Sequence, residues 1–149
     1  MRYLPSKPKE PLLTYNVPTR LWQKVGTYLF QWANKNYLII VDYYSMWPEV
    51  FPLSNTNSIN VILACKESFS RNGVPEELAS DNGTQYTSKL FYQCSQQRKF
   101  RHTVSISHYP RSNGLAEATI KLVKLIVKKC HLSNEEIFKG IFILRNFPI

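Results

Sequence analysis

Hydrophobic residues follow two patterns along the chain, one typical of strands and one typical of helices, and together they predict a mixed α/β domain. Aromatic and β-branched residues dominate 22–32, a continuous apolar run crosses 37–43, and a third such segment spans 47–53. Short apolar segments bounded by turn residues are typical of strands. We therefore expect an antiparallel three-stranded meander with a hairpin turn at 34–36. Pro48 indicates that the third strand lies at an edge or begins there.

Beyond the meander, helical and strand patterns alternate. An apolar face, an N-cap at Asn57 or Ser58 and a stop at Gly73 predict a helix over 59–72. Three strands followed by alternating helices and strands indicate a mixed α/β sheet. The other expected elements are strands over 77–79 and 100–105, a loop over 107–113, and helices from Ser88 to about 98, from Gly114 to about 130 and over 134–146.

Length and composition fit one domain behind an extended arm. The chain has 149 residues, of which 44% are hydrophobic, enough for one packed core but not comfortably for two. Residues 1–20 carry four prolines and read as an arm, which leaves 21–149 as the domain. No apolar run reaches the length of a membrane span, and no secretory leader is evident, so we expect an intracellular protein without membrane contact.

The cysteines predict neither a disulfide framework nor a metal site. They are three in number, widely spaced and without a Cys-x-x-Cys pair, so we interpret them as reduced thiols that fill the core. A zinc site is disfavoured because the candidate ligands lack the usual spacing. The cysteines are Cys65, Cys94 and Cys130, and the zinc candidates would be Cys130, His131, His102 and His108.

Positive charge is concentrated in one segment. The formal net charge is +9, and residues 98–129 carry eight basic side chains against a single acid, Glu117. A concentration of this kind indicates a polyanionic partner, most often nucleic acid. The alternative is a solvated basic face that keeps the domain in solution.

Two carboxylates mark the stretch that carries the candidate chemistry. Asp81 opens an Asp-Asn-Gly turn, and Glu117 follows with 35 residues between them, in the first turns of a helix that Asn113 could cap. Two carboxylates on separate rigid elements are what a hard cation such as Mg²⁺ requires, provided that folding brings them together.

Four runs of the sequence together resemble the D,D-35-E catalytic core of retroviral and retrotransposon integrases, in its gypsy-class form. The resemblance implies a ribonuclease H-like fold with a mixed five-stranded sheet, DNA as partner, a homodimer, a nuclear location and no small-molecule substrate. It also implies that 21–149 is an integrase-core-like domain that ends before the family's usual last helix. The runs are 22–27, 38–45, 80–83 and 109–117.

One residue departs from the family pattern at a decisive position. The family holds two Mg²⁺ ions with three carboxylates, the first in a run like Val-Gly-Thr-Asp-Leu-Phe. The corresponding run, 25–30, has Tyr28 in place of that Asp. A phenol is neutral at pH 7 and a poor ligand for Mg²⁺, so we expect weak or absent metal binding and a degenerate or domesticated copy. Asp42 or Glu49 could substitute, but we expect structural roles for both.

The long helix is expected to present a charged stripe. At 100° per residue, Glu117, Lys121, Lys124 and Lys128 fall within roughly 60° of one another. The resemblance implies that this stripe meets DNA, together with Arg111 and Asn113. The alternative is an ordinary amphipathic helix with a Glu117–Lys121 pair. The side expected to be buried holds Leu115, Leu122, Val123, Ile126 and Cys130.

These observations favour a nucleic-acid-binding module of integrase-core type in which Asp81 and Glu117 survive but strand transfer is lost. Three alternatives stay open at this point: an active Mg²⁺-dependent integrase, a protein–protein or dimerisation module that retains only the fold, and a hydrolytic nuclease of the same broad fold.

Overall fold

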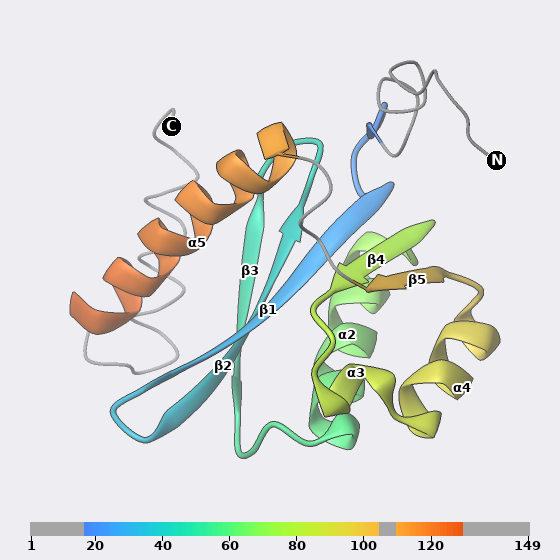
Figure 1. The fold of residues 1–149 in the computed structure, drawn as a ribbon, viewed down its shortest axis with the longest axis horizontal. Coiled ribbons are helices and arrows are strands. Elements are labelled where there is room, and N and C mark those ends of the chain that lie inside the picture. Colours follow the sequence, from blue (N-terminus) through green and yellow to red (C-terminus); the bar gives the residue numbers. More distant parts are fainter. Residues whose placement is uncertain (1–16, 105–109, 130–149) are drawn as a thin grey trace, which may run out of the picture.

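A five-stranded sheet with helices on both faces forms the framework of the computed structural model, which describes residues 17–104 and 110–129, with the backbone alone for 110–113 (Figure 1). The elements are β1 (Lys24–Trp32), β2 (Lys35–Asp42), β3 (Pro48–Leu53), α2 (Ser58–Asn72), β4 (Glu77–Ser80), α3 (Thr84–Thr87), α4 (Lys89–Arg98), β5 (Arg101–Val104) and α5 (Pro110–Lys129).

The sheet has the strand order β3-β2-β1-β4-β5. β1, β2 and β3 pair antiparallel, whereas β4 joins β1 in parallel and β5 joins β4 in parallel. This confirms the predicted meander and the mixed five-stranded sheet. It also confirms the edge position expected from Pro48, because β3 pairs only with β2 among the described strands.

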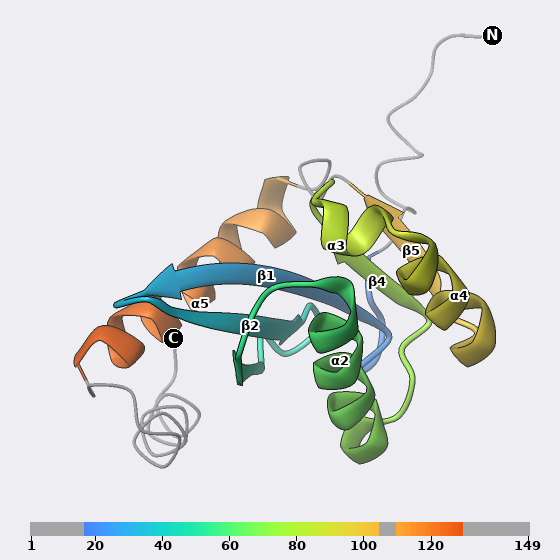
Figure 2. The same cartoon turned by 90° about the horizontal axis from the view of Figure 1, so that it is seen from below.

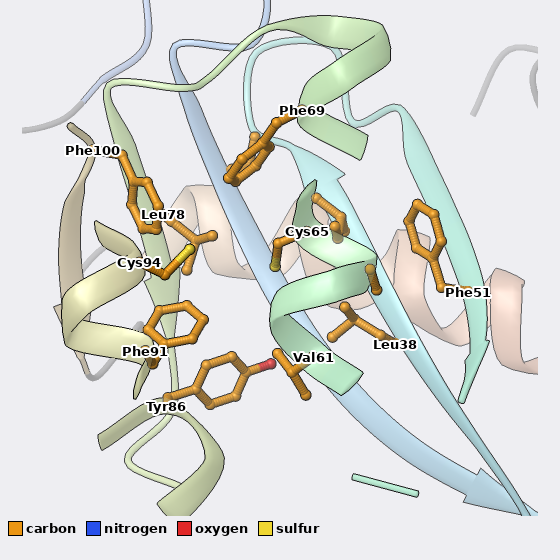
Figure 3. Packing of buried hydrophobic residues seen from close by; sticks show 13 residues of the cluster. Leu38, Phe51, Val61, Cys65, Phe69, Leu78, Tyr86, Phe91, Cys94 and Phe100 are labelled. Carbon is orange, nitrogen blue, oxygen red and sulfur yellow. The ribbon is translucent and has the colours of Figure 1, made fainter. Parts of the chain in front are cut away.

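Alternate residues of the central strands feed two separate cores. Val25, Leu38 and Ile40 pack with α2, α4 and the ring of Tyr86 on one face of the sheet (Figure 3). Ile39 and Val41 belong to the cluster on the other face, which α5 covers with Ala116, Ile120, Val123 and Val127 (Figure 2). The continuous apolar run in β2 is therefore explained by burial on both faces.

The first hairpin turns one residue earlier than predicted. Ala33 and Asn34 both have positive φ, 52° and 61°, and the ladder already pairs Trp32 with Lys35. A two-residue turn with positive φ at both positions matches the twist of the flanking strands. The prediction of a turn over 34–36 was wrong because Lys35 and Asn36 belong to β2.

The helix ends confirm some predictions and correct others. Asn57 caps α2 by accepting a hydrogen bond from the Asn60 N–H, and Ser88 caps α4 in the same way. The long helix, however, begins at Pro110, so 110–113 is helical rather than loop, and Asn113 lies inside the helix rather than capping it. Proline suits the first helical turn, because a backbone N–H at this position would have no partner within the helix.

The remaining comparison concerns α3 and the predicted segments that the structure does not describe. The short α3 was not predicted, because Thr84–Thr87 is a single turn without an apolar periodicity to announce it. The helix predicted over 134–146 and most of the predicted arm lie outside the described residues. Among the helices that are described, none is long and apolar enough to cross a membrane.

Both described cysteines fill the core. Cys65 and Cys94 are buried free thiols in the cluster beneath α2 and α4, as predicted (Figure 3). Burial raises the pKa of the Cys65 thiol well above its usual value, which keeps it protonated and unreactive. Of the zinc candidates, only His102 lies in the described residues.

Candidate active site

The parallel pairing of β1 and β4 brings two of the predicted positions to the same level of the sheet. The ladder matches Gly26 with Ala79, and Tyr28 and Asp81 each follow two residues later. The Thr27 hydroxyl extends this contact by donating to the Ala79 carbonyl at 3.3 Å. If this register continued past the ladder, it would set Tyr28 opposite Asp81, on strands about 5 Å apart.

Asp81 forms the turn that the sequence predicted. Its side-chain Oδ1 accepts a hydrogen bond from the Gly83 N–H at 2.8 Å, and the residue is exposed. The buried Ser80 side chain fixes the backbone of this turn. Its Oγ donates to the Asp81 carbonyl at 2.8 Å and lies 2.7 Å from His102 Nε2. The Ser80–His102 contact links β4 to β5 and positions the turn. From the sequence, His102 was only a disfavoured zinc candidate, and Ser80 had no predicted role.

Tyr28 fills the corner where the family pattern has its first acid. Its side chain packs in the cluster under α5, and its hydroxyl lies 2.6 Å from that of Tyr43. Burial raises the pKa of Tyr28 strongly, with smaller contributions from Tyr43, the Glu117 charge and Tyr86. The phenol is therefore neutral at physiological pH and already has a hydrogen-bond partner.

Gly26 makes this pair of tyrosines possible. A Cβ atom at position 26 would lie 2.7 Å from Cε1 of the Tyr43 ring, closer than side chains pack. The ring of Tyr43 thus lies directly on the backbone of β1, which brings its hydroxyl to Tyr28. An isolated glycine inside a strand often marks a close approach of this kind, and this was the available sequence signal.

Glu117 approaches the same corner from α5. The residue is exposed, and its charge is close enough to contribute to the raised pKa of Tyr28. Burial raises the pKa of Tyr86, and the Asp81 charge adds to that shift. Tyr86, however, packs in the core with α2 and α4, whereas Tyr28 packs against the core on the other face of the sheet. Direct convergence of the two carboxylates on one pocket stays a prediction.

The alternative acids are engaged elsewhere. Asp42 accepts hydrogen bonds from the Trp22 N–H and from Ser45, while Glu49 binds Ser68 and Arg71. Both carboxylates stabilise local structure, as expected, and neither replaces the missing ligand at Tyr28.

The donor set does not fit a pair of divalent cations. At the three positions that the resemblance assigns to carboxylates, the chain has Asp81, Glu117 and the neutral, hydrogen-bonded phenol of Tyr28. Within the part of the chain that the structure describes, no three His, Cys, Asp or Glu side chains gather as a metal-holding group. No metal-dependent step is therefore assigned to this site.

The predicted basic stripe runs along α5 away from Glu117. Lys121 is exposed, whereas the Lys124 Nζ lies 5.5 Å from the centre of the Phe30 ring and the Lys128 Nζ 5.0 Å from that of Trp32. Two of the three lysines thus also cover aromatic residues of β1. The helix begins early enough to include Arg111 and Asn113, whose side chains are outside the description.

The buried side of α5 differs from the predicted one. Ala116, Thr119, Ile120, Val123 and Val127 face the sheet, while Leu115 is 52% exposed. Of the predicted buried set, Val123 is correct, Leu115 is wrong, Leu122 and Ile126 are half-buried, and Cys130 lies outside the described residues. The buried face is turned by roughly a fifth of the helix circumference from the predicted side.

Residues 16–110 match the family described as Integrase core domain. An uncharacterized protein of Caenorhabditis elegans is 36% identical over 120 residues, and the Pol-related polyprotein of a mouse intracisternal A-particle is 30% identical over 121. Each match covers 80% of this chain, but only 10% and 14% of those relatives, so the chain spans a small part of their length.

The fold is shared with solved structures of low sequence identity. The catalytic core domain of BIV integrase superposes with a TM-score of 0.77 at 17% identity, covering 86% of each chain. A chain of a simian T-cell lymphotropic virus intasome gives a TM-score of 0.70 at 20% identity, covering 85% of this chain and 48% of that one. The sheet, its two cores and these likenesses confirm the expected ribonuclease H-like fold.

Proposed function

The chain belongs to the Integrase core domain family, and from that premise we propose that it is a nucleic-acid-binding module in which strand-transfer chemistry is lost. The observation that carries the proposal is the Tyr28–Tyr43 pair, with hydroxyls 2.6 Å apart in the corner beside Glu117. A neutral phenol already held by a second phenol offers a divalent cation neither charge nor a vacant position.

Two surviving acids limit what metal binding remains. Asp81 and Glu117 would hold a single Mg²⁺ weakly, because cation affinity rises with the number of charged oxygen ligands. The two-metal arrangement that activates one oxygen and stabilises the other needs all three acids. A gypsy-class origin, a nuclear location and a homodimer are further parts of the proposal, and they rest on the sequence resemblance.

DNA binding is assigned to the charged stripe on α5. Lys121 is exposed and next to the Glu117 corner, whereas Lys124 and Lys128 divide their role between phosphate contact and the cover of β1. We therefore expect Lys121 to contribute most cleanly to electrostatic binding. Each phosphate contact contributes about 0.9 to the slope of log K against log salt for duplex DNA.

The test is a salt titration of DNA affinity by fluorescence anisotropy, comparing Lys121→Gln with Lys66→Gln. Lys66 lies on α2, which covers the opposite face of the sheet, so its loss removes the same charge at a distant place. We expect Lys121→Gln to reduce the slope by about 1 and Lys66→Gln to leave it unchanged.

Three outcomes separate this proposal from its alternatives. Equal slopes in both variants contradict the assignment of the stripe. Binding that is absent at every salt concentration favours an interaction or dimerisation module. Joining or processing of labelled DNA ends by the natural chain with Mg²⁺ would show an active integrase and refute the lost-chemistry part.

A further inference from the structure

A cavity of about 480 Å³ opens at the start of β1. It lies where the start of β1, the turn between β2 and β3, and the end of α2 meet. The register pairs Asp42 with Val25, and Tyr28 follows three residues further along β1. The described lining residues are Leu21, Trp22, Asp42, Ser45, Trp47 and Asn72.

Asp42 gives this cavity a buried negative charge. The residue is only 2% exposed, and no lysine, arginine or histidine of the described chain forms an ion pair with it. Its four hydrogen-bond donors are all neutral: the Trp22 N–H at 3.0 Å, the Tyr44 N–H at 3.2 Å, and the N–H and Oγ of Ser45 at 3.4 and 2.8 Å. Neutral donors satisfy the oxygens but leave the charge uncompensated.

The same hydrogen bonds leave the carboxylate no vacant acceptor position. Each oxygen of Asp42 accepts two donors, and a carboxylate has about four lone-pair sites in all. A cation that must donate hydrogen bonds therefore gains little here. The nearby Ser45 Oγ also already accepts from the Trp47 N–H, at 3.2 Å. Beside this buried carboxylate, a guanidinium or primary ammonium group would have N–H groups without an acceptor, which is costly for a buried polar group.

Two indole side chains, those of Trp22 and Trp47, line the same cavity. The Trp22 ring is fixed by its Nε1–H, which donates to the Gly73 carbonyl at 2.6 Å. Trp47 is 41% exposed and Leu21 63% exposed, so the mouth of the cavity is apolar. Aromatic faces attract cations through their quadrupole, most strongly tryptophan, and cages of this type hold methylated ammonium groups.

We propose that this cavity binds a quaternary ammonium group, specifically the side chain of an N-trimethylated lysine of a partner protein. The group carries the charge that Asp42 attracts and no N–H that would need an acceptor. Its neutral four-carbon stem suits the apolar mouth at Leu21 and Trp47. A choline headgroup carries the same cation, but its adjoining phosphate would bring a negative charge toward Asp42. The site does not depend on nucleic-acid binding elsewhere in the chain.

The test uses the three tryptophans as internal reporters in ¹H–¹⁵N NMR spectra of the full chain. The indole N–H signals of Trp22 and Trp47 report the cavity, and Trp32, at the far end of β1, is the control. Tetramethylammonium should shift the first two signals until the shift saturates. The concentration needed for half of this shift should be at least tenfold lower than for its neutral isostere, tert-butanol. Equal response to tert-butanol, or an equal shift of Trp32, would overturn the proposal.

Variants and peptide probes then test the residues and the source. Trp47→Ala should weaken tetramethylammonium binding at least tenfold, while Trp32→Ala leaves it unchanged; equal affinities in the two variants contradict the cage. Asp42→Asn is a less clean test because Asp42 also holds the turn. A trimethyl-lysine peptide should bind at least tenfold more tightly than its unmodified form and than phosphocholine. Equal binding of phosphocholine refutes the lysine assignment.

Discussion

Replacing Tyr28 by Asp should return a metal requirement to the corner beside Glu117. The substitution removes a ring packed under α5 and places a carboxylate near Glu117. Loss of a fully buried aromatic side chain costs about 3–5 kcal/mol, and because Tyr28 is only partly buried we expect roughly 2 kcal/mol. Repulsion from Glu117 should add about 1 kcal/mol at neutral pH, since an exposed charge is screened.

A divalent cation should reverse much of this loss in the Asp variant alone. A ligand present at a hundred times its Kd stabilises the folded state by about 2.7 kcal/mol. Urea unfolding, followed by tryptophan fluorescence, would be compared in Mg²⁺ or Mn²⁺ and in chelator at matched ionic strength. Tyr28→Asn is the matched control, because it loses the same ring and gains no charge.

If the cation stabilises the natural chain, Tyr28→Asn and Tyr28→Asp to the same degree, then position 28 does not face a metal corner. If Tyr28→Asp is as stable as Tyr28→Asn in chelator and ignores the cation, Glu117 and Asp81 do not converge there. A cation effect confined to Tyr28→Asp supports the geometry, and end joining by that variant would extend it to chemistry.

Two further predictions concern the framework of the sheet. Glu77→Gln should lower the free energy of unfolding by about 3 kcal/mol, because this carboxylate is only 3% exposed and pairs with Lys24 and Arg101. The same change at the exposed Glu76, measured in the same way by urea unfolding, should cost under about 1 kcal/mol. Similar losses in the two variants would contradict the buried pairing. Burial lowers the pKa of His102, so the stability that its neutral form supports is present above pH 6.5 and is lost as the pH falls below that value. His102→Gln should flatten this fall in the free energy of unfolding with pH. An unchanged pH dependence would refute the assignment.

Local patterns predicted most of the framework because they act over a few residues. The caps of α2 and α4, the edge position of β3 and the buried run in β2 each follow from side chains within one turn or one strand. The errors also have local causes. The start of α5 was missed because the Pro110–Asn113 stretch reads equally as a turn, and glycine at 114 resembles a helix boundary.

The orientation of α5 could not be settled by its own periodicity. Apolar residues occupy more than one side of the helix, so a wheel shows an apolar face without showing which side meets the sheet. The structure buries Ala116, Ile120 and Val127 and leaves Leu115 exposed. Contacts with the sheet accompany this orientation: the ammonium groups of Lys124 and Lys128 lie over the Phe30 and Trp32 rings of β1.

The sequence by itself determined the family pattern, the two surviving acids and the departure at Tyr28, because each is a matter of residue type and spacing. Only the tertiary structure decided what that phenol does. Its partner Tyr43 lies 15 residues away and reaches it through the antiparallel register of β1 and β2 and the space left by Gly26. The surroundings of Asp42 are likewise a product of folding, since Trp22 and Trp47 are far apart in the sequence and line one cavity with it only in the folded chain.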